Sequence, residues 1–153
     1  MTPRELIGIA EVPGGAPLKL FKRGGDFMIT LERNELMSSR MRGSEIALGD
    51  MTCARLPKGT AAKVLIGGYG MGFTLRAVLA ALDSKAHIIV AELVPEIIAW
   101  ARGPMQALAD GCLDDTRVTI DMRDVAVVIK AGAGSYDAIM LDVDEALRLH
   151  LGL

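Results

Sequence analysis

The feature that most constrains the fold is a run of glycines between a strongly apolar segment and a helix-like segment. The glycines are Gly67, Gly68, Gly70 and Gly72. They follow the apolar residues 64–66, and helical apolar spacing begins at Phe73. Glycine permits a sharp turn and lets a ligand approach the backbone, and the first N–H groups of a helix can bind an anion. The segment therefore predicts a nucleotide site; the alternative is a plain corner that needs left-handed backbone angles.

After residue 60 the chain alternates between short apolar runs and longer runs with helical spacing. This alternation is typical of βαβ units and a parallel sheet. We expect strands at 63–66, 87–92, 118–121 and 137–141, and helices at 73–82, from Pro95 onward and at 124–130. Gly103-Pro104 is expected to bend or divide the second of these helices. Residues 60–153 are therefore predicted to form an α/β domain with a Rossmann-like, doubly wound parallel sheet.

Residues 1–59 follow a different pattern and are predicted to form a separate unit. Alternating apolar residues predict strands at 6–12, 18–22 and 27–32, and Gly24-Gly25 suits a tight hairpin between the last two. Helix-like spacing follows over 44–56 before Pro57-Lys58-Gly59. We expect a small antiparallel β unit with a connecting helix.

An acidic residue follows the second strand of the α/β domain. Glu92 lies 20 residues after Gly72, near the spacing of about 20 residues expected for an acid that binds ribose hydroxyl groups. The alternative is an exposed carboxylate at the end of a strand. Because the strand, the glycines, the helix and the acid occur in this order, the pattern favours a nucleotide site over a plain turn.

Composition excludes several classes of protein. Hydrophobic residues make up 51% of the 153 residues and charged residues 24%, so the chain can bury a core. A net charge of -2 gives no basic field for nucleic acid or an anionic membrane. With neither a spanning segment nor a leader peptide in the sequence, we expect a soluble, cytoplasmic protein. Cys53 and Cys112 are expected to be buried, reduced thiols. The two histidines lack metal-binding neighbours, so no metal is expected.

The spacing of the glycines limits which nucleotide the site would bind. A dinucleotide fingerprint that begins with Gly68 and Gly70 requires a third glycine at position 73. The chain has Phe73 there, which argues against NAD as the ligand. The spacing Gly68, Gly70, Gly72 is instead similar to that of class I S-adenosylmethionine enzymes. Within that class, residues 67–76, 91–98 and 136–142 resemble the spermidine synthase (polyamine aminopropyltransferase) group, whose members carry a β-rich N-terminal domain.

The resemblance implies roles for several residues. Gly68, Gly70, Gly72 and Glu92 would hold the nucleoside of S-adenosylmethionine or of its decarboxylated form, which serves as co-substrate. Asp124 matches the position at which the family places an acid near the adenine amino group. The product would be a small amine that has received an aminopropyl or a methyl group.

Three positions depart from the family pattern. Gly70 stands where the family's loop carries the aspartate near the aminopropyl end, so methyl transfer, including methyl transfer to a substrate that is not a polyamine, remains an alternative to aminopropyl transfer. Asp142-Val143-Asp144-Glu145 replaces the usual Asp-Ser-Ser-Asp-Pro. Of the family's Tyr-His-Glu run near the acceptor, only the acid is retained, as Glu45.

The acids among these positions suggest how a transferase would work. Asp142, expected at the carboxyl end of the last strand beside the glycine loop, is placed for a general base that takes a proton from the amine. Asp144 and Glu45 would bind other cationic ends of the acceptor. The alternatives are that Asp144 caps a helix and that Glu45 is a first-turn acid favoured by the helix dipole.

The chain ends 11 residues after Asp142, before the fifth strand and terminal antiparallel pair of a complete class I fold. An unpaired strand edge invites pairing with another chain, so we expect a homodimer or a truncated product. A second class of function also stays open, namely a nucleoside-binding or interaction module without catalysis.

Overall fold

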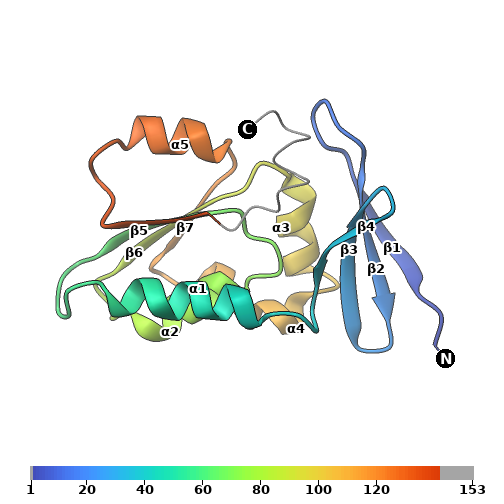
Figure 1. Cartoon of the computed structure of the whole chain (residues 1–153), viewed down its shortest axis with the longest axis horizontal. Helices are drawn as coiled ribbons and strands as arrows, with labels where there is room; N and C mark the ends of the chain where they lie inside the picture. Colours follow the sequence, from blue (N-terminus) through green and yellow to red (C-terminus); the bar gives the residue numbers. More distant parts are fainter. Residues whose placement is uncertain (1, 142–153) are drawn as a thin grey trace.

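A computed structural model describes residues 2–141, which form two β-sheets (Figure 1). The first sheet is antiparallel, with the strand order β1-β2-β3-β4. Its strands are β1 (Glu5–Ala10), β2 (Leu18–Arg23), β3 (Asp26–Leu31) and β4 (Asn34–Ser38). Leu18 and Leu20 alternate with exposed or half-buried residues, so one face of the sheet is covered and the other meets solvent.

The predicted antiparallel unit is present, but it contains a strand that the sequence analysis did not predict. Gly24 adopts φ +58° in the hairpin between β2 and β3, as glycine in a tight turn does. The next hairpin turns at Glu32, which takes φ +55° although it is not glycine. This turn returns the chain along β3 and forms β4, in which Met37 pairs with Ile29.

The second sheet is parallel and has the strand order β7-β6-β5-β8. Its strands are β5 (Lys63–Gly67), β6 (His87–Ala91), β7 (Val118–Asp121) and β8 (Ala138–Leu141). The connections contain α2 (Phe73–Ala81), α3 (Pro95–Arg102), α4 (Gln106–Ala109), the 3-10 helix η1 (Cys112–Asp114) and α5 (Val125–Ala131). The predicted α/β class and Rossmann-like sheet are confirmed, as is the division of the helix near Gly103.

Helices cover both faces of the parallel sheet, because buried side chains alternate along its strands. Figure 1 shows α5 on one face and α1 (Gly43–Ala54) with α2 on the other. Leu65 packs toward α5 together with Ile89. Their neighbour Ile66 belongs to the main core on the opposite face. Strands buried on both faces read as continuous apolar runs, which is why residues 63–66 and 87–92 were recognisable.

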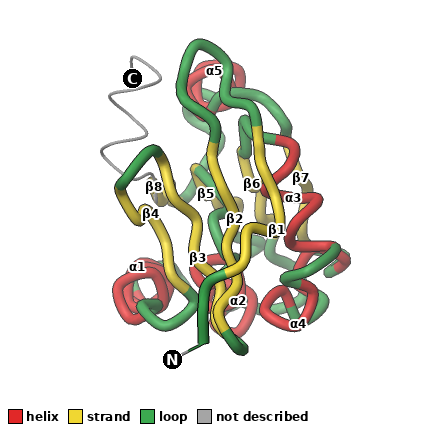
Figure 2. The backbone as a smooth tube through the Cα atoms, turned by 90° about the vertical axis from the view of Figure 1, so that its right-hand side faces the viewer, coloured by secondary structure: helices red, strands yellow, loops and turns green. Residues whose placement is uncertain are grey.

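The two sheets share one apolar core. The main cluster of buried residues includes Leu20 and Ile29 from the antiparallel sheet together with Val64 and Ile88 from the parallel sheet. Helix α3 contacts β1, and the two approach so closely that a Cβ at Gly8 would lie 2.5 Å from Trp100 Nε1. Figure 2 views the antiparallel sheet face-on, with the parallel sheet behind it.

Helix α1 leads from the antiparallel sheet to the parallel one and packs along α2. A Cβ built at Gly49 would lie 2.8 Å from Ala77 Cβ and 3.2 Å from the Thr74 carbonyl oxygen. Glycine therefore permits the close approach of the two helices. The contact fixes the first turn of α1 near the first turn of α2, where the glycine loop ends.

Candidate functional site

The glycine loop connects the carboxyl end of β5 to the amino end of α2, as predicted. Gly68, Gly70 and Gly72 adopt φ values of +91°, +60° and +86°, a region that other residues rarely enter. The Gly68 amide donates to the Ala91 carbonyl at 2.7 Å, which ties the loop to the end of β6. The loop thus lies at the carboxyl edge of the sheet, the edge at which doubly wound folds bind ligands.

Glu92 lies directly beneath this loop and is only 6% exposed. Its Oε1 accepts a hydrogen bond from the Tyr69 amide at 2.9 Å, and its Oε2 accepts one from the Val94 amide at 3.2 Å. Burial raises the pKa of the Glu92 carboxyl, and hydrogen bonds from backbone amides lower it in part. The carboxylate is therefore held against the loop rather than exposed at a strand end.

Asp124 is placed at the same edge of the sheet, after β7. It is the N-cap of α5, and its Oδ1 accepts a hydrogen bond from the Ala126 amide at 2.7 Å. The carboxylate is thus oriented by the helix that follows it. The contact between β6 and β7 extends to this edge, where the Glu92 amide donates to the Asp121 carbonyl at 2.9 Å.

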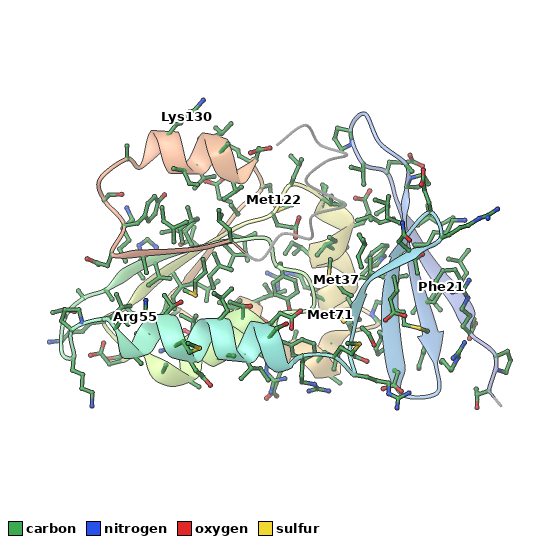
Figure 3. All side chains as sticks on the ribbon, viewed as in Figure 1. Phe21, Met37, Arg55, Met71, Met122 and Lys130 are labelled. Atoms are coloured by element: carbon green, nitrogen blue, oxygen red, sulfur yellow. The ribbon has the colours of Figure 1, made fainter. Side chains whose placement is uncertain are left out.

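A cavity of about 400 Å³ opens between the glycine loop, β4 and the first turn of α1. Its described lining residues are Glu35, Leu36, Met37, Ser38, Met41, Ser44, Glu45, Tyr69, Gly70, Met71 and Phe73. Of the predicted site residues, Gly70 and Glu45 line this cavity. Figure 3 shows Met37 and Met71 close to each other where the antiparallel sheet approaches α1. The antiparallel sheet therefore supplies one wall of a cavity whose other wall is the loop.

Met37 is a residue of this cavity that the sequence analysis missed. A Cβ built at Gly70 would lie 3.2 Å from Met37 Sδ, so the methionine occupies the space into which a side chain at position 70 would project. Met37 was missed because β4 was missed. The adjacent apolar residues Leu36 and Met37 after Glu35 were the available signal, but two residues are too few to define a strand pattern.

Tyr69 was also missed as a structural part of the loop. Its side chain is 4% exposed, and its hydroxyl lies 3.6 Å from Cys112 Sγ. Burial raises the pKa of both groups. A Cβ at Gly72 would lie 2.5 Å from the Tyr69 hydroxyl, so the ring packs tightly inside the turn that its own backbone forms. Cys53 and Cys112 are both free and buried, as predicted.

The other predicted acids, Asp142 and Asp144, lie outside the described residues. The last described residue is Leu141, which ends β8 and pairs with Gly67 at the start of the loop. Within residues 2–141, no group of histidine, cysteine, aspartate or glutamate side chains is arranged to hold a metal ion. None of the helices in that part of the chain has the length and apolar character needed to cross a membrane.

The architecture defines the class of protein as a Rossmann-like α/β protein preceded by an antiparallel sheet. No protein-family model matches the chain. Over 87 residues it is 31% identical to a polyamine aminopropyltransferase from Ruegeria sp. (strain TM1040), an alignment that covers 57% of this chain and 30% of the relative.

Two solved structures have the same fold. A spermidine synthase from Thermotoga maritima superimposes with a TM-score of 0.72 at 23% identity, over 92% of this chain and 47% of that one. A spermidine synthase in complex with the transition state analogue AdoDATO gives a TM-score of 0.71 at 23% identity, over 93% and 48%. The predicted spermidine synthase-like resemblance is confirmed, and the chain spans less than half the length of each of these proteins.

Proposed function

We propose that this chain binds the nucleoside of decarboxylated S-adenosylmethionine or of S-adenosylmethionine and transfers an aminopropyl or a methyl group to a small amine. The observation that carries the proposal is the buried Glu92 carboxylate, held by the Tyr69 amide directly under the glycine loop. The resemblance to an aminopropyltransferase and the spermidine synthase fold support the same function.

The site residues fit such a nucleoside chemically. The Glu92 carboxylate is held by backbone amides that include those of Tyr69 and Val94, and it would accept a further hydrogen bond from a ribose hydroxyl. Gly68, Gly70 and Gly72 leave the backbone of the loop open to close approach. Asp124 would lie near the adenine amino group, and its carboxylate is already oriented by the Ala126 amide.

The reaction would be an in-line displacement at carbon. The lone pair of the amine nitrogen forms the new N–C bond, the C–S bond of the sulfonium breaks, and its electron pair returns to sulfur to give a neutral thioether. The nitrogen must then lose a proton, for which Asp142 remains the proposed general base and Asp144 a proposed acceptor ligand. Most of the catalytic effect would come from positioning the two reactants.

Residues 60–153 would contribute the nucleoside side of the site, and residues 1–59 the side on which the group to be transferred meets its acceptor. The cavity between β4 and the loop supports this division, because its wall comes from both segments. Association of two chains as a homodimer stays part of the proposal, with β8 as the edge strand of the described sheet.

Calorimetric titration with 5′-methylthioadenosine, which contains the nucleoside without the charged arm, tests the nucleoside site. We expect the wild-type chain to bind, and Glu92→Gln to weaken binding about tenfold, because an amide replaces the acceptor of charge-assisted hydrogen bonds. Glu5→Gln, which changes an exposed glutamate on β1, is the matched control and should bind like the wild type. Equal affinities for wild type and Glu92→Gln would contradict the proposed role of Glu92.

Incubation of the chain with each sulfonium donor and a set of amines, followed by mass spectrometry, then identifies the group transferred. A mass increase of the amine by an aminopropyl group or by a methyl group distinguishes the two activities. Nucleoside binding with no modified amine would instead support a binding module without catalysis.

A further inference from the structure

The cavity beside the glycine loop has an uneven distribution of charge. Among its described lining residues the carboxylates are Glu35 and Glu45, while the lining from the loop side comprises Tyr69, Gly70, Met71 and Phe73. Tyr69, Met71 and Phe73 are all buried. The negative charge of the cavity therefore comes from β4 and α1, and the loop supplies apolar surface.

Met37 lies beside Gly70, the residue of the loop that has no side chain. Met37 Sδ lies 3.2 Å from the position that a Cβ at Gly70 would take. A thioether thus fills the space above the loop residue, and a side chain there would have to displace it. A cationic group that enters the cavity from the loop must find its counter-charge on another element.

Glu45 is better placed for that purpose than Glu35. Glu45 is a half-buried residue, and its carboxylate accepts a hydrogen bond from Ser44 Oγ at 3.0 Å at the surface. Its carbonyl oxygen accepts a hydrogen bond from Thr74 Oγ1 at 3.3 Å, which ties it to the first turn of α2. Glu35 is exposed on β4, where water screens its charge.

We propose that Glu45 binds the ammonium group on the aminopropyl arm of a decarboxylated sulfonium nucleoside. This assignment rests on the proposed function, because it places the nucleoside on the glycine loop. In it, Met37 and Met71 pack along the methylene groups of the arm, and the ammonium reaches Glu45 across the cavity. S-adenosylmethionine carries a carboxylate on the same arm, and Glu45 repels it. The site therefore selects the decarboxylated donor.

Two ligands test the role of Glu45 separately from nucleoside binding. 5′-Methylthioadenosine has the nucleoside but lacks the arm, whereas decarboxylated S-adenosylmethionine has both. We expect the wild-type chain to bind the decarboxylated donor about tenfold more tightly than methylthioadenosine. Glu45→Gln should reduce this ratio to about threefold or less and leave the affinity for methylthioadenosine unchanged. Glu45→Asp, which retains the charge, should recover part of the preference.

Glu35→Gln is the matched control, because it removes a carboxylate from the same cavity at an exposed position. It should leave the ratio close to that of the wild type. A ratio that Glu45→Gln does not change, or tighter binding of S-adenosylmethionine than of its decarboxylated form, would overturn the role of Glu45. If methylthioadenosine binds without any preference for the longer ligand, this inference fails while the nucleoside site stands. If neither ligand binds, the proposed function fails and the role of Glu45 fails with it.

Discussion

The Glu92 carboxylate accepts a hydrogen bond from the Tyr69 backbone amide at 2.9 Å, so the acid that follows β6 holds the loop that follows β5. The same carboxylate accepts a hydrogen bond from the Val94 amide before α3. Two loops at the carboxyl edge of the sheet are therefore joined through one buried side chain. This contact gives Glu92 a structural role that is independent of any ligand.

Replacement of Glu92 by leucine should destabilise the chain. Leucine has similar size but leaves the amides of Tyr69 and Val94 without an acceptor, at a cost of about 2–4 kcal/mol in the free energy of unfolding. Urea unfolding followed by circular dichroism measures the change. Replacement of the exposed Glu5 by leucine is the control and should change the stability by less than about 0.5 kcal/mol. A stable Glu92→Leu variant would show that the two amides find other partners.

The stability difference between the wild type and Glu92→Gln should depend on pH. Burial raises the pKa of Glu92 in the folded chain above its usual value of 4.5, so the folded state holds this proton to higher pH than the unfolded state. The stabilising contribution of this proton is complete below the usual value. It is lost as the pH rises through the raised pKa.

We therefore expect the free energy of unfolding of the wild type to fall relative to that of Glu92→Gln as the pH rises above about 4.5. Unfolding curves of the two proteins at a series of pH values measure the difference. A difference that stays flat would mean that the pKa of the carboxyl is unchanged despite its burial, and one that increases with pH would mean that the backbone hydrogen bonds lower this pKa.

Arg117 should stabilise the end of α2. Its Nη1 donates to the carbonyl oxygens of Leu79 and Leu82 at 3.0 and 2.8 Å, and its Nη2 forms an ion pair with Asp115 Oδ2 at 2.9 Å. Arg117→Ala removes these donors from a helix end and should cost about 2 kcal/mol. Arg123→Ala is the control, because Arg123 forms a similar pair with Asp121 at the surface, and its removal should cost much less than that of Arg117.

The same pair predicts a loss of stability in acid. Hydrogen bonds from Arg117 lower the pKa of Asp115 to about 2, from an ordinary value of 3.8. Because the folded pKa is the lower one, the stabilisation is present above the ordinary value and is lost as the pH falls from there toward the folded pKa. Partial exposure to solvent limits the effect to about 1 kcal/mol. Asp115→Asn should remove this part of the acid dependence in unfolding measurements.

A residue larger than glycine at position 49 should destabilise the contact between α1 and α2. Alanine in place of glycine ordinarily stabilises a helix by about 1 kcal/mol, but a Cβ at Gly49 would lie 2.8 Å from Ala77 Cβ. We expect Gly49→Ala to destabilise the chain by about 2 kcal/mol, because the helices must separate. A Cβ at Gly43 meets nothing within 4 Å, so Gly43→Ala is the control and should not destabilise. Thermal unfolding of both variants distinguishes crowding from helix propensity.

The sequence predicted the parts of the fold that depend on short-range patterns. Continuous apolar runs identified β5 and β6, and the order of strand, glycines, helix and acid brought Glu92 to the loop. This worked because parallel strands end at a common edge. The structure then adds what no spacing shows, namely that the Glu92 carboxylate is turned inward and bonded to Tyr69.

The sequence did not predict the wall of the cavity that β4 supplies. The turn before β4 uses Glu32 at φ +55°, an angle for which glycine or asparagine is the usual signal. Without such a signal, β4 and its residue Met37 could not be placed opposite the loop. The closeness of Met37 to Gly70 is a tertiary contact between β4 and the loop that follows β5, which local patterns do not encode.

The cost of a side chain at Gly70 can be separated into backbone strain and crowding by Met37. Gly24 and Gly70 adopt nearly the same φ, +58° and +60°, but a Cβ at Gly24 meets nothing within 4 Å, whereas one at Gly70 lies 3.2 Å from Met37 Sδ. Gly24→Ala therefore measures strain alone, about 1 kcal/mol.

We expect Gly70→Ala to cost about 0.5–1 kcal/mol more than Gly24→Ala, because the flexible methionine must shift. In a Met37→Ala background the extra cost should disappear, since the crowding atom is absent. Urea unfolding of the three single variants and the Gly70→Ala/Met37→Ala double variant gives the coupling energy of the pair. A coupling energy of zero would show that Met37 leaves room above the loop, and the aminopropyl arm would then lack one of the surfaces proposed to pack along it.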